Sequence, residues 1–99
     1  MMISVKVHTS GKEVLVAACD EDLLGQTYRS DKLKIYVSRD FYEGQICDEA
    51  ALVSRLDMAT IANLVGKRTV EAAVKHGIVD DDCVIVIGGV PHAQMARMI

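Results

Sequence analysis

Residues 2–19, MISVKVHTSGKEVLVAAC, decide the fold class. Apolar and polar residues alternate over residues 2–7, which is typical of a strand with one buried face. Residues 10–13, Ser-Gly-Lys-Glu, have the composition of a turn, and the nearly continuous apolar run of residues 14–19 follows. The stretch therefore predicts an antiparallel β-hairpin at the start of the chain.

A third strand is predicted over residues 32–37, where the alternation returns. Leu33, Ile35 and Val37 are expected to face inward. Ser38–Gln45, which contains two aromatic residues and a glycine, is expected to be a loop.

Two acidic segments mark predicted helix starts. Asp20–Asp22 are expected to cap a single helical turn that Gly25 closes, because acidic residues stabilise the positive end of a helix. From Asp48 the apolar residues take up the helical period, with Leu52 and Leu56 in one stripe. Asp48 is therefore the predicted N-cap of a longer helix.

The second half of the chain predicts helix, strand and helix. Residues 59–65 continue as an apolar segment up to Gly66, which either separates two helices or lies within one long bent helix; we prefer the break. A helix is predicted over residues 67–77, a buried strand over 84–87, and a short C-terminal helix that begins at Pro91.

These segments together predict one compact α+β domain over residues 1–99. The expected architecture is a mostly antiparallel or mixed sheet of about four strands, with two to three helices packed on one of its faces. Ninety-nine residues are enough for one core and too few for two.

The composition narrows the function classes. No apolar run approaches the roughly 20 residues that a membrane span requires, and the N-terminus lacks the layout of a signal peptide. We therefore expect a cytoplasmic protein without a membrane partner. The formal net charge is −3, so any binding of nucleic acid has to come from a local basic surface.

The cysteines and serines give no support for metal or covalent chemistry. Cys19, Cys47 and Cys83 are odd in number and widely spaced, which argues against a disulfide framework and a zinc site. We expect them to be small, semi-buried apolar residues. No serine has the context of a nucleophile, and Asp80–Asp82 is a charge run, so we assign no catalytic residue, metal or cofactor.

A basic sheet surface is the first candidate binding site. If the first and third strands expose the faces assigned above, then Lys6, His8, Lys34 and Tyr36 share one surface, with Lys32 and Arg29 nearby. Lysines with an exposed aromatic ring suit the phosphates and bases of single-stranded RNA. The alternative is a solvated face whose lysines protect the sheet from aggregation.

A helix start at Gly66 is the second candidate. Lys67 and Arg68 stand at the positive end of the predicted helix, where a bound anion would offset their repulsion and use the free backbone N–H groups. Asn63 lies just before this start. The alternative is an ordinary capped surface helix.

The segment from Gly88 to Gln94 is the third candidate. Gly88 and Gly89 are expected to bring backbone N–H groups close to a phosphate or carboxylate, with His92 and Gln94 beside them. The spacing matches neither a P-loop nor a dinucleotide fingerprint. The alternative is a tight turn whose side chains hold the chain end against the sheet.

Six blocks of the sequence resemble an archaeal family of small proteins known as domain of unknown function 424. They are, in order, VKVH (5–8), LLG (23–25), KLK (32–34), FYEG (41–44), ATIANLVG (59–66) and GGVPHAQ (88–94). The resemblance implies a cytoplasmic α+β protein, and it supplies no catalytic residues. It places Asn63, Gly66, His92 and Gln94 within the two most specific blocks.

These observations favour a non-enzymatic binding module in RNA- or translation-related processes, with RNA or a translation-related protein as its partner. The first alternative is an enzyme that binds a small molecule or phosphate and uses His92 as acid or base. That alternative requires His92, Asn63 and Gly88-Gly89 to converge on one cleft.

The second alternative is a protein–protein adaptor or a homodimer. It would show as an exposed apolar patch around Phe41, Tyr42 or Met58.

Overall fold

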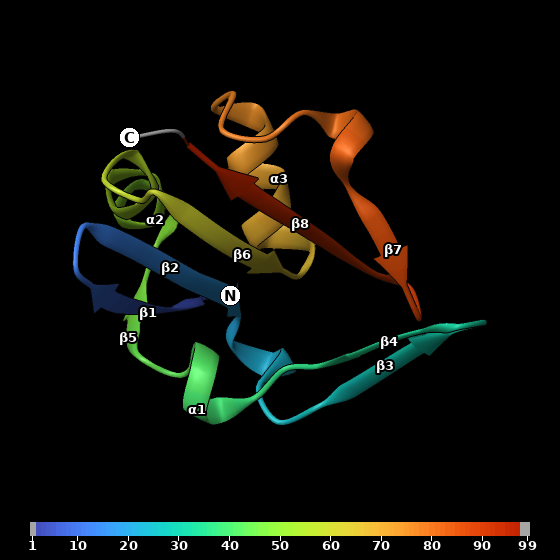
Figure 1. Ribbon diagram of the computed structural model, residues 1–99. Helices are drawn as coiled ribbons and strands as arrows, with labels where there is room; N and C mark the ends of the chain where they lie inside the picture. The colour runs from blue at the N-terminus through green and yellow to red at the C-terminus, as the bar shows by residue number, and fades with distance from the viewer. Residues whose placement is uncertain (1, 98–99) are drawn as a thin grey trace.

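Two β-sheets and three α-helices make up the structure, a computed structural model that describes residues 2–97 (Figure 1). Within this range the strands are β1 (Ile3–Ser10), β2 (Glu13–Asp20), β3 (Thr27–Ser30), β4 (Leu33–Tyr36), β5 (Gln45–Cys47), β6 (Ile61–Val65), β7 (Ile85–Ile87) and β8 (Val90–Ala96). The helices are α1 (Arg39–Tyr42), α2 (Glu49–Asp57) and α3 (Lys67–Lys75), with 3-10 turns η1 (Glu21–Leu23) and η2 (Asp81–Cys83). The predicted α+β class is confirmed, with more strands than the four expected.

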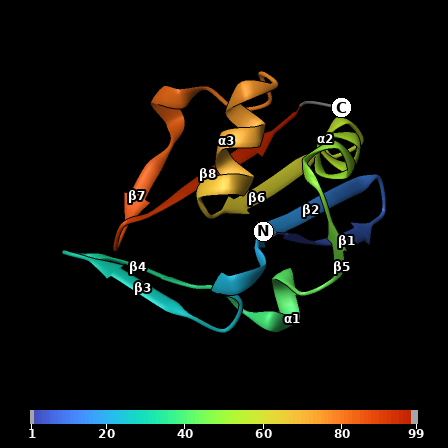
Figure 2. The ribbon, with the colours of Figure 1, turned by 180° about the vertical axis from the view of Figure 1, so that it is seen from behind.

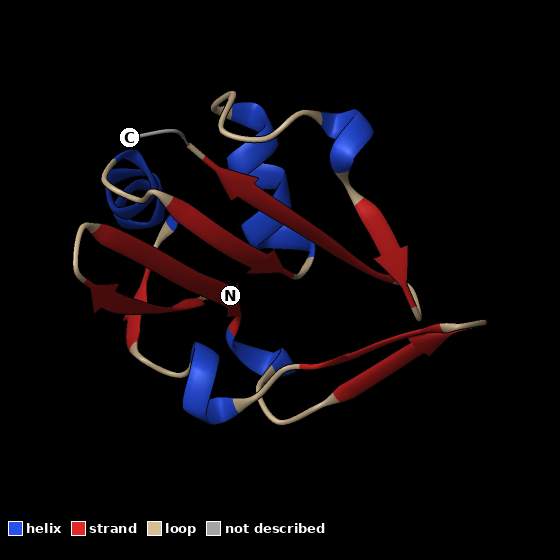
Figure 3. Cartoon of the chain, viewed as in Figure 1, coloured by secondary structure: helices blue, strands red, loops and turns tan. Residues whose placement is uncertain are grey.

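The larger sheet has the strand order β5-β1-β2-β6-β8-β7. Its first hairpin is the predicted one, since β1 pairs antiparallel with β2 from Ile3↔Asp20 to Ser10↔Glu13. The neighbouring pair β2–β6 is parallel, which makes the sheet mixed. Parallel pairing puts the carboxyl ends of β2 and β6 at the same edge of the sheet, where α3 begins (Figure 3).

Helices α2 and α3 cover one face of this sheet (Figures 1 and 2). Their apolar stripes pack on alternate residues of the central strands, as β-strand geometry requires. We call this the helix-side core; its fully or nearly buried members include Val16, Ala18, Leu52, Leu56, Ala62, Leu64, Val70, Ala73, Ala93 and Met95.

The opposite face of the sheet is partly covered by α1 and by a two-stranded ribbon of β3 and β4, which we call the β-ribbon (residues 27–36). The residues buried beneath them form a second core of Ala17, Cys19, Leu24, Val37, Tyr42 and Val65. The far end of the β-ribbon meets the turn between β7 and β8, where the Gly88 N–H donates to the Ser30 hydroxyl. The β-ribbon thus spans from α1 to the last hairpin (Figure 1).

The third predicted strand is therefore placed differently from the expectation. Its counterpart, β4, pairs with β3, a strand the sequence did not predict, and neither belongs to the larger sheet. Leu33 is 50% exposed, since the β-ribbon is too short and narrow to bury a full face. The predicted loop Ser38–Gln45 contains α1 and leads directly into the edge strand β5.

The predicted helical segment at residues 59–65 is wrong, because residues 61–65 form the central strand β6. Ala62 and Leu64 face the helix-side core, while Val65 faces the second core. A strand that is buried on both faces has no polar alternation, so its composition does not distinguish it from a buried helix.

The predicted C-terminal helix at Pro91 is also wrong, because this residue lies in β8. Gly88 and Gly89 have φ of +58° and +82°, which suits the two-residue turn that joins β7 to β8. Pro91 accepts a backbone bond from Gly66 N at 2.9 Å, and Gly66 O is already bonded to Val70 N. Gly66 O, which the N–H of any other residue at position 91 would meet, therefore has a partner although proline has no N–H.

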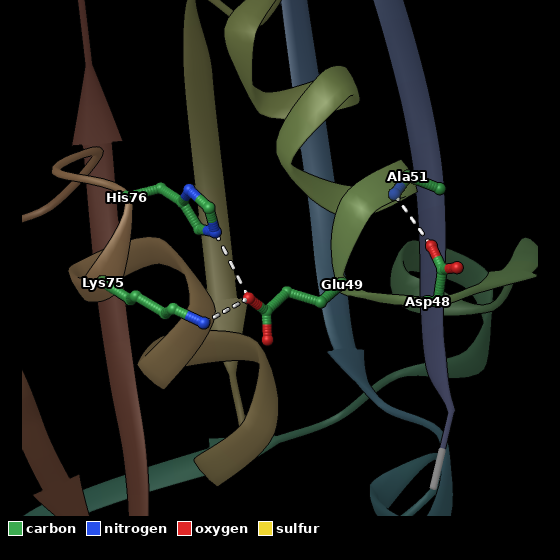
Figure 4. A network of polar contacts seen from close by, with 5 residues as sticks. All are labelled: Asp48, Glu49, Ala51, Lys75 and His76. Atoms are coloured by element: carbon green, nitrogen blue, oxygen red, sulfur yellow. Dashed lines mark hydrogen bonds and ion pairs between the residues drawn. The ribbon is translucent and has the colours of Figure 1, made fainter.

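The other predicted turns and helices are present, but the predicted cap of η1 by Asp20 is wrong, because this side chain makes no bond to that turn. Asp48 caps α2, since its Oδ1 accepts from Ala51 N at 2.9 Å (Figure 4). Helix α3 spans Lys67–Lys75, and Gly77 follows it with φ of +72°. No helix within residues 2–97 is long and apolar enough to cross a membrane.

The turn between β7 and β8 provides a matched pair of substitutions. Gly89→Ala should lower the free energy of unfolding by about 1–2 kcal/mol, because its added Cβ meets nothing and only the positive φ is unfavourable. Gly88→Ala adds a Cβ at 2.9 Å from the Arg29 backbone, so roughly 1–3 kcal/mol of steric strain should add to that loss. Urea denaturation of both variants measures the difference; equal losses would show that the β-ribbon does not press against this turn.

Candidate functional site

The positive end of α3 is occupied by a side chain of the protein itself. Asp20, at the end of β2 and 5% exposed, accepts from Arg68 N at 3.1 Å and from Thr69 N at 2.9 Å. It also accepts from the Thr69 hydroxyl at 2.7 Å. A buried carboxylate needs such partners, and the helix N-terminus supplies them.

Gly66 leaves room for the contact between Asp20 and the start of α3. Its φ of +110° and ψ of 152° lie in a region that is essentially restricted to glycine. A Cβ there would lie 2.5 Å from Asp20 Cγ. Gly66 is thus required by the Asp20–helix contact, which explains its presence without a bound ligand. The internal carboxylate of Asp20 already accepts from two of the N–H groups to which the predicted external anion at this helix start would bind.

Beside this helix start lies a groove of about 710 Å³. Lys67 and Arg68 line it together with the Gly89–Pro91 backbone, so the segments around residues 66 and 90 do meet in space. Its charges are mixed: it is lined by Asp22, Glu49, Glu71, Lys67, Arg68 and Lys75, besides the buried Asp20. Such a balance gives the groove no clear preference for an anion.

Asn63 and His92 do not line this groove. They lie on the sheet face opposite the helices, because their neighbours Leu64 and Ala93 belong to the helix-side core. Asn63 pairs with Gln94 across β6 and β8, and Gln94 Nε2 donates to Asn63 Oδ1 at 2.8 Å. The convergence that the enzyme hypothesis requires, of His92, Asn63 and Gly88-Gly89 on one cleft, is therefore not found.

His92 is half-buried and tied to the neighbouring strand. Its Nδ1 lies 3.1 Å from Leu64 O, so in the neutral ring Nδ1–H donates to that carbonyl. Burial lowers the pKa of His92, and the bond to Leu64 opposes this effect. The contact matches the alternative in which this side chain holds the last strand to the sheet.

The predicted basic surface does not form as expected. Lys6 and His8 lie on β1 of the larger sheet, whereas Lys34 and Tyr36 lie on the β-ribbon. Lys6 Nζ donates to Asp40 O at 2.7 Å. The His8 ring stacks on Phe41 with ring centroids 5.0 Å apart. Both of these β1 side chains, Lys6 and His8, therefore contact α1.

The β-ribbon carries the basic and aromatic residues by itself. Register pairs Arg29 with Lys34 and Thr27 with Tyr36, and these four side chains share the outer face, because Tyr28 and Ile35 pack inward. Tyr36 is 56% exposed. Within residues 2–97, Arg29 and Lys34 lie in no ion pair, and neither does the exposed Lys32 at the turn. Strand β3 was not predicted from the sequence, and neither was the position of Arg29 opposite Lys34.

His76 and Lys75 connect α3 to α2. His76 Nε2 lies 3.2 Å and Lys75 Nζ 3.5 Å from Glu49 Oε2 (Figure 4). The bond to His76, followed by the charge of Lys75, lowers the pKa of Glu49. This contact is exposed. Together with the position of His76 at the negative end of α3, it gives this residue a structural role.

Two of the three cysteines are held as thiols by their surroundings. Burial raises the pKa of the Cys19 thiol to about 12 and also raises that of Cys47. Cys83 is exposed, contrary to the expectation of three semi-buried residues, because it lies in the surface turn η2. Within residues 2–97 no group of three or more His, Cys, Asp or Glu side chains is arranged to hold a metal ion.

Comparison with known proteins supports the resemblance seen in the sequence. The family model described as "Protein of unknown function (DUF424)" matches residues 8–98. No curated protein matches the chain. The crystal structure of an uncharacterized conserved protein from Methanopyrus kandleri is similar, with 26% identity and a TM-score of 0.82, over 100% of this chain and 96% of that one.

Replacement of Asp20 tests the internal cap. Asp20→Asn removes the charge and puts an amide NH2 group, which is a donor, opposite a backbone N–H that needs an acceptor. The free energy of unfolding should therefore fall by roughly 1.5–3 kcal/mol. The matched variant is Asp48→Asn at the exposed cap of α2, where asparagine serves nearly as well and less than about 0.5 kcal/mol should be lost. Thermal and urea denaturation compare the two; similar small losses would contradict the assigned role of Asp20.

The protonation state of His92 tests the burial of its ring and its bond to Leu64 O. Because burial lowers its pKa, His92 should be neutral at pH 7 with the proton on Nδ1. The unfolded chain then binds a proton at a higher pH than the folded chain, so this group should destabilise the fold as pH falls below about 6.5. NMR of the imidazole nitrogens follows both states; a His92 that is charged at pH 7 would contradict the burial of this ring.

Proposed function

The chain belongs to the DUF424 family of proteins of unknown function, and we propose that it is a non-enzymatic module that binds single-stranded RNA through the outer face of the β-ribbon. We place it in RNA- or translation-related processes of the archaeal cytoplasm. The observation that carries the proposal is the pairing of Arg29 with Lys34, neither of which has a carboxylate partner within residues 2–97, beside the exposed ring of Tyr36.

Like charges directly opposite each other on a two-stranded ribbon destabilise it. Arg29 and Lys34 lie on neighbouring strands, which are spaced by about 5 Å, and among the described residues neither is in an ion pair. Phosphates bound between them would remove this repulsion and release counterions into solution. A polyanion is therefore the partner that best matches this pair of cations.

Tyr36 adds a stacking surface on the same face. It is 56% exposed and lies on the last pair of the β-ribbon, two residues along β4 from Lys34. Because alternate residues of a strand share a face, a strand of nucleic acid could place a phosphate on Lys34 and a base on Tyr36. Single-stranded RNA presents both groups at once, whereas the bases of a duplex are already stacked.

The net charge of −3 does not oppose this proposal, because the charges are separated along the chain. Residues 26–39 contain Arg29, Lys32, Lys34 and Arg39 against the single acid Asp31. Of these cations, Arg39 pairs with Glu43 at 3.1 Å, which leaves the outer face of the β-ribbon basic. A local basic surface on an acidic protein orients an anionic ligand toward that surface.

Binding of fluorescein-labelled oligouridylate and oligoadenylate, each of roughly ten nucleotides, tests the proposal. Tyr36→Ala should weaken binding by about 5- to 150-fold, because stacking of a base contributes ~1–3 kcal/mol, while Tyr36→Phe retains it. Arg29→Ala/Lys34→Ala should reduce the slope of log affinity against log salt by about 1.4, as expected for two phosphates.

The control is Lys67→Ala/Arg68→Ala, which removes the same charge from the groove beside α3 and should change neither quantity. If this variant loses binding and the ribbon variant does not, the RNA lies in the groove and the proposed surface is wrong. Absence of micromolar or tighter binding at about 50 mM salt would remove the RNA proposal altogether.

A further inference from the structure

Strand β7 leaves one edge of the larger sheet open. Its pairs with β8 are Ile85↔His92, Val86↔Pro91 and Ile87↔Val90. Pro91 has no N–H, so the two hydrogen-bonded pairs are the outer ones, and Val86 directs its N–H and C=O away from β8. An edge with such groups is ready to pair with another strand.

The side chains at this edge are apolar. Val86 is 59% and Ile85 46% exposed. The second alternative predicted an exposed apolar patch around Phe41, Tyr42 or Met58, but Tyr42 is buried and Phe41 packs beneath the β-ribbon. Met58 is 73% exposed and lies at the end of α2. The other edge strand of the larger sheet, β5, exposes Ile46 by 41%, so β7, with Ile85 and Val86, carries the larger apolar surface of the two edges.

The two ends of β7 carry opposite charges. The exposed acids Asp80, Asp81 and Asp82 precede the strand, separated from it by Cys83 and Val84. At its other end, the tip of the β-ribbon meets Gly88, and this tip bears the exposed cations Arg29 and Lys32 against one exposed acid, Asp31, so its net charge is positive. The edge is therefore acidic at its start, apolar in the middle and basic at its end.

We propose that this edge binds a second copy of the chain through antiparallel pairing of β7 with β7, around a twofold axis at Val86. Antiparallel pairing brings the acidic start of each strand to the basic end of the other, so both ends of the contact are attractive. A parallel arrangement would place like charges together at each end. Val86 exchanges its N–H and C=O bonds with its own copy, and the two sheets join into one.

The strand is short, so the contact belongs with small, transient interfaces, and dissociation constants of roughly 1 µM to 1 mM are the range to measure. Sedimentation velocity without RNA, over this range of protein concentration, should show a monomer–dimer equilibrium that weakens as salt is raised. Val86→Lys should abolish the dimer, and Met58→Lys, at the exposed apolar site outside β7, should leave it intact.

Charge reversal makes the test specific. Asp81→Lys/Asp82→Lys and Arg29→Glu/Lys32→Glu should each be monomeric, since both ends of each homodimer become repulsive. An equimolar mixture of the two variants should dimerise, because both ends are then attractive again. Circular dichroism confirms that each variant is folded. A wild-type monomer throughout the range, a dimer that survives in each variant alone, or a mixture that stays monomeric would overturn the proposal.

Discussion

The contact between the Asp20 carboxylate and the first turn of α3 holds the two halves of the structure together. The parallel pairing of β2 with β6 brings Asp20 to the sheet edge where the helix starts, and Gly66 leaves room for the carboxylate. Three hydrogen bonds compensate the burial of this charge, and they occupy N–H groups that would otherwise attract an anion. The cations Lys67 and Arg68 thus flank a helix start whose N–H groups at residues 68 and 69 already have a carboxylate acceptor, and the surface where basic residues outnumber acids lies on the β-ribbon.

Local patterns in the sequence predicted local structure well. The β1–β2 hairpin, the Asp48 cap and the end of α3 at Gly77 depend on residues close in the chain, and each is present. The strand at residues 61–65 was mistaken for a helix, because four of its five residues are apolar and they lie on both faces, so no regular polar alternation marks it as a strand. Pro91 was mistaken for a helix start, because its tolerance in β8 depends on Gly66 O bonding to Val70, which no local pattern reveals.

The candidate site was predicted in its residue types and less well in its arrangement. Lys34, Lys32 and Tyr36 were singled out, but their partner is Arg29 on a strand of polar residues that has no clear β-pattern. Asp20 was assigned to the nearby turn, yet it caps a helix almost fifty residues later. Asn63, His92 and Gln94 did meet across neighbouring strands, where they bond to one another and to the backbone. Contacts between distant segments decide all three outcomes, and a single sequence does not encode them in its periodicity.

The most direct test of the central claim is to map where RNA contacts the protein. Two-dimensional ¹⁵N–¹H spectra, recorded while unlabelled oligouridylate is added, report on each backbone amide. The account predicts that the shifted amides cluster in residues 27–36, with the start of α3 at residues 66–70 unaffected. Shifts that concentrate at the start of α3, or spectra that do not change at all, would contradict the assignment of the β-ribbon as the RNA-binding surface.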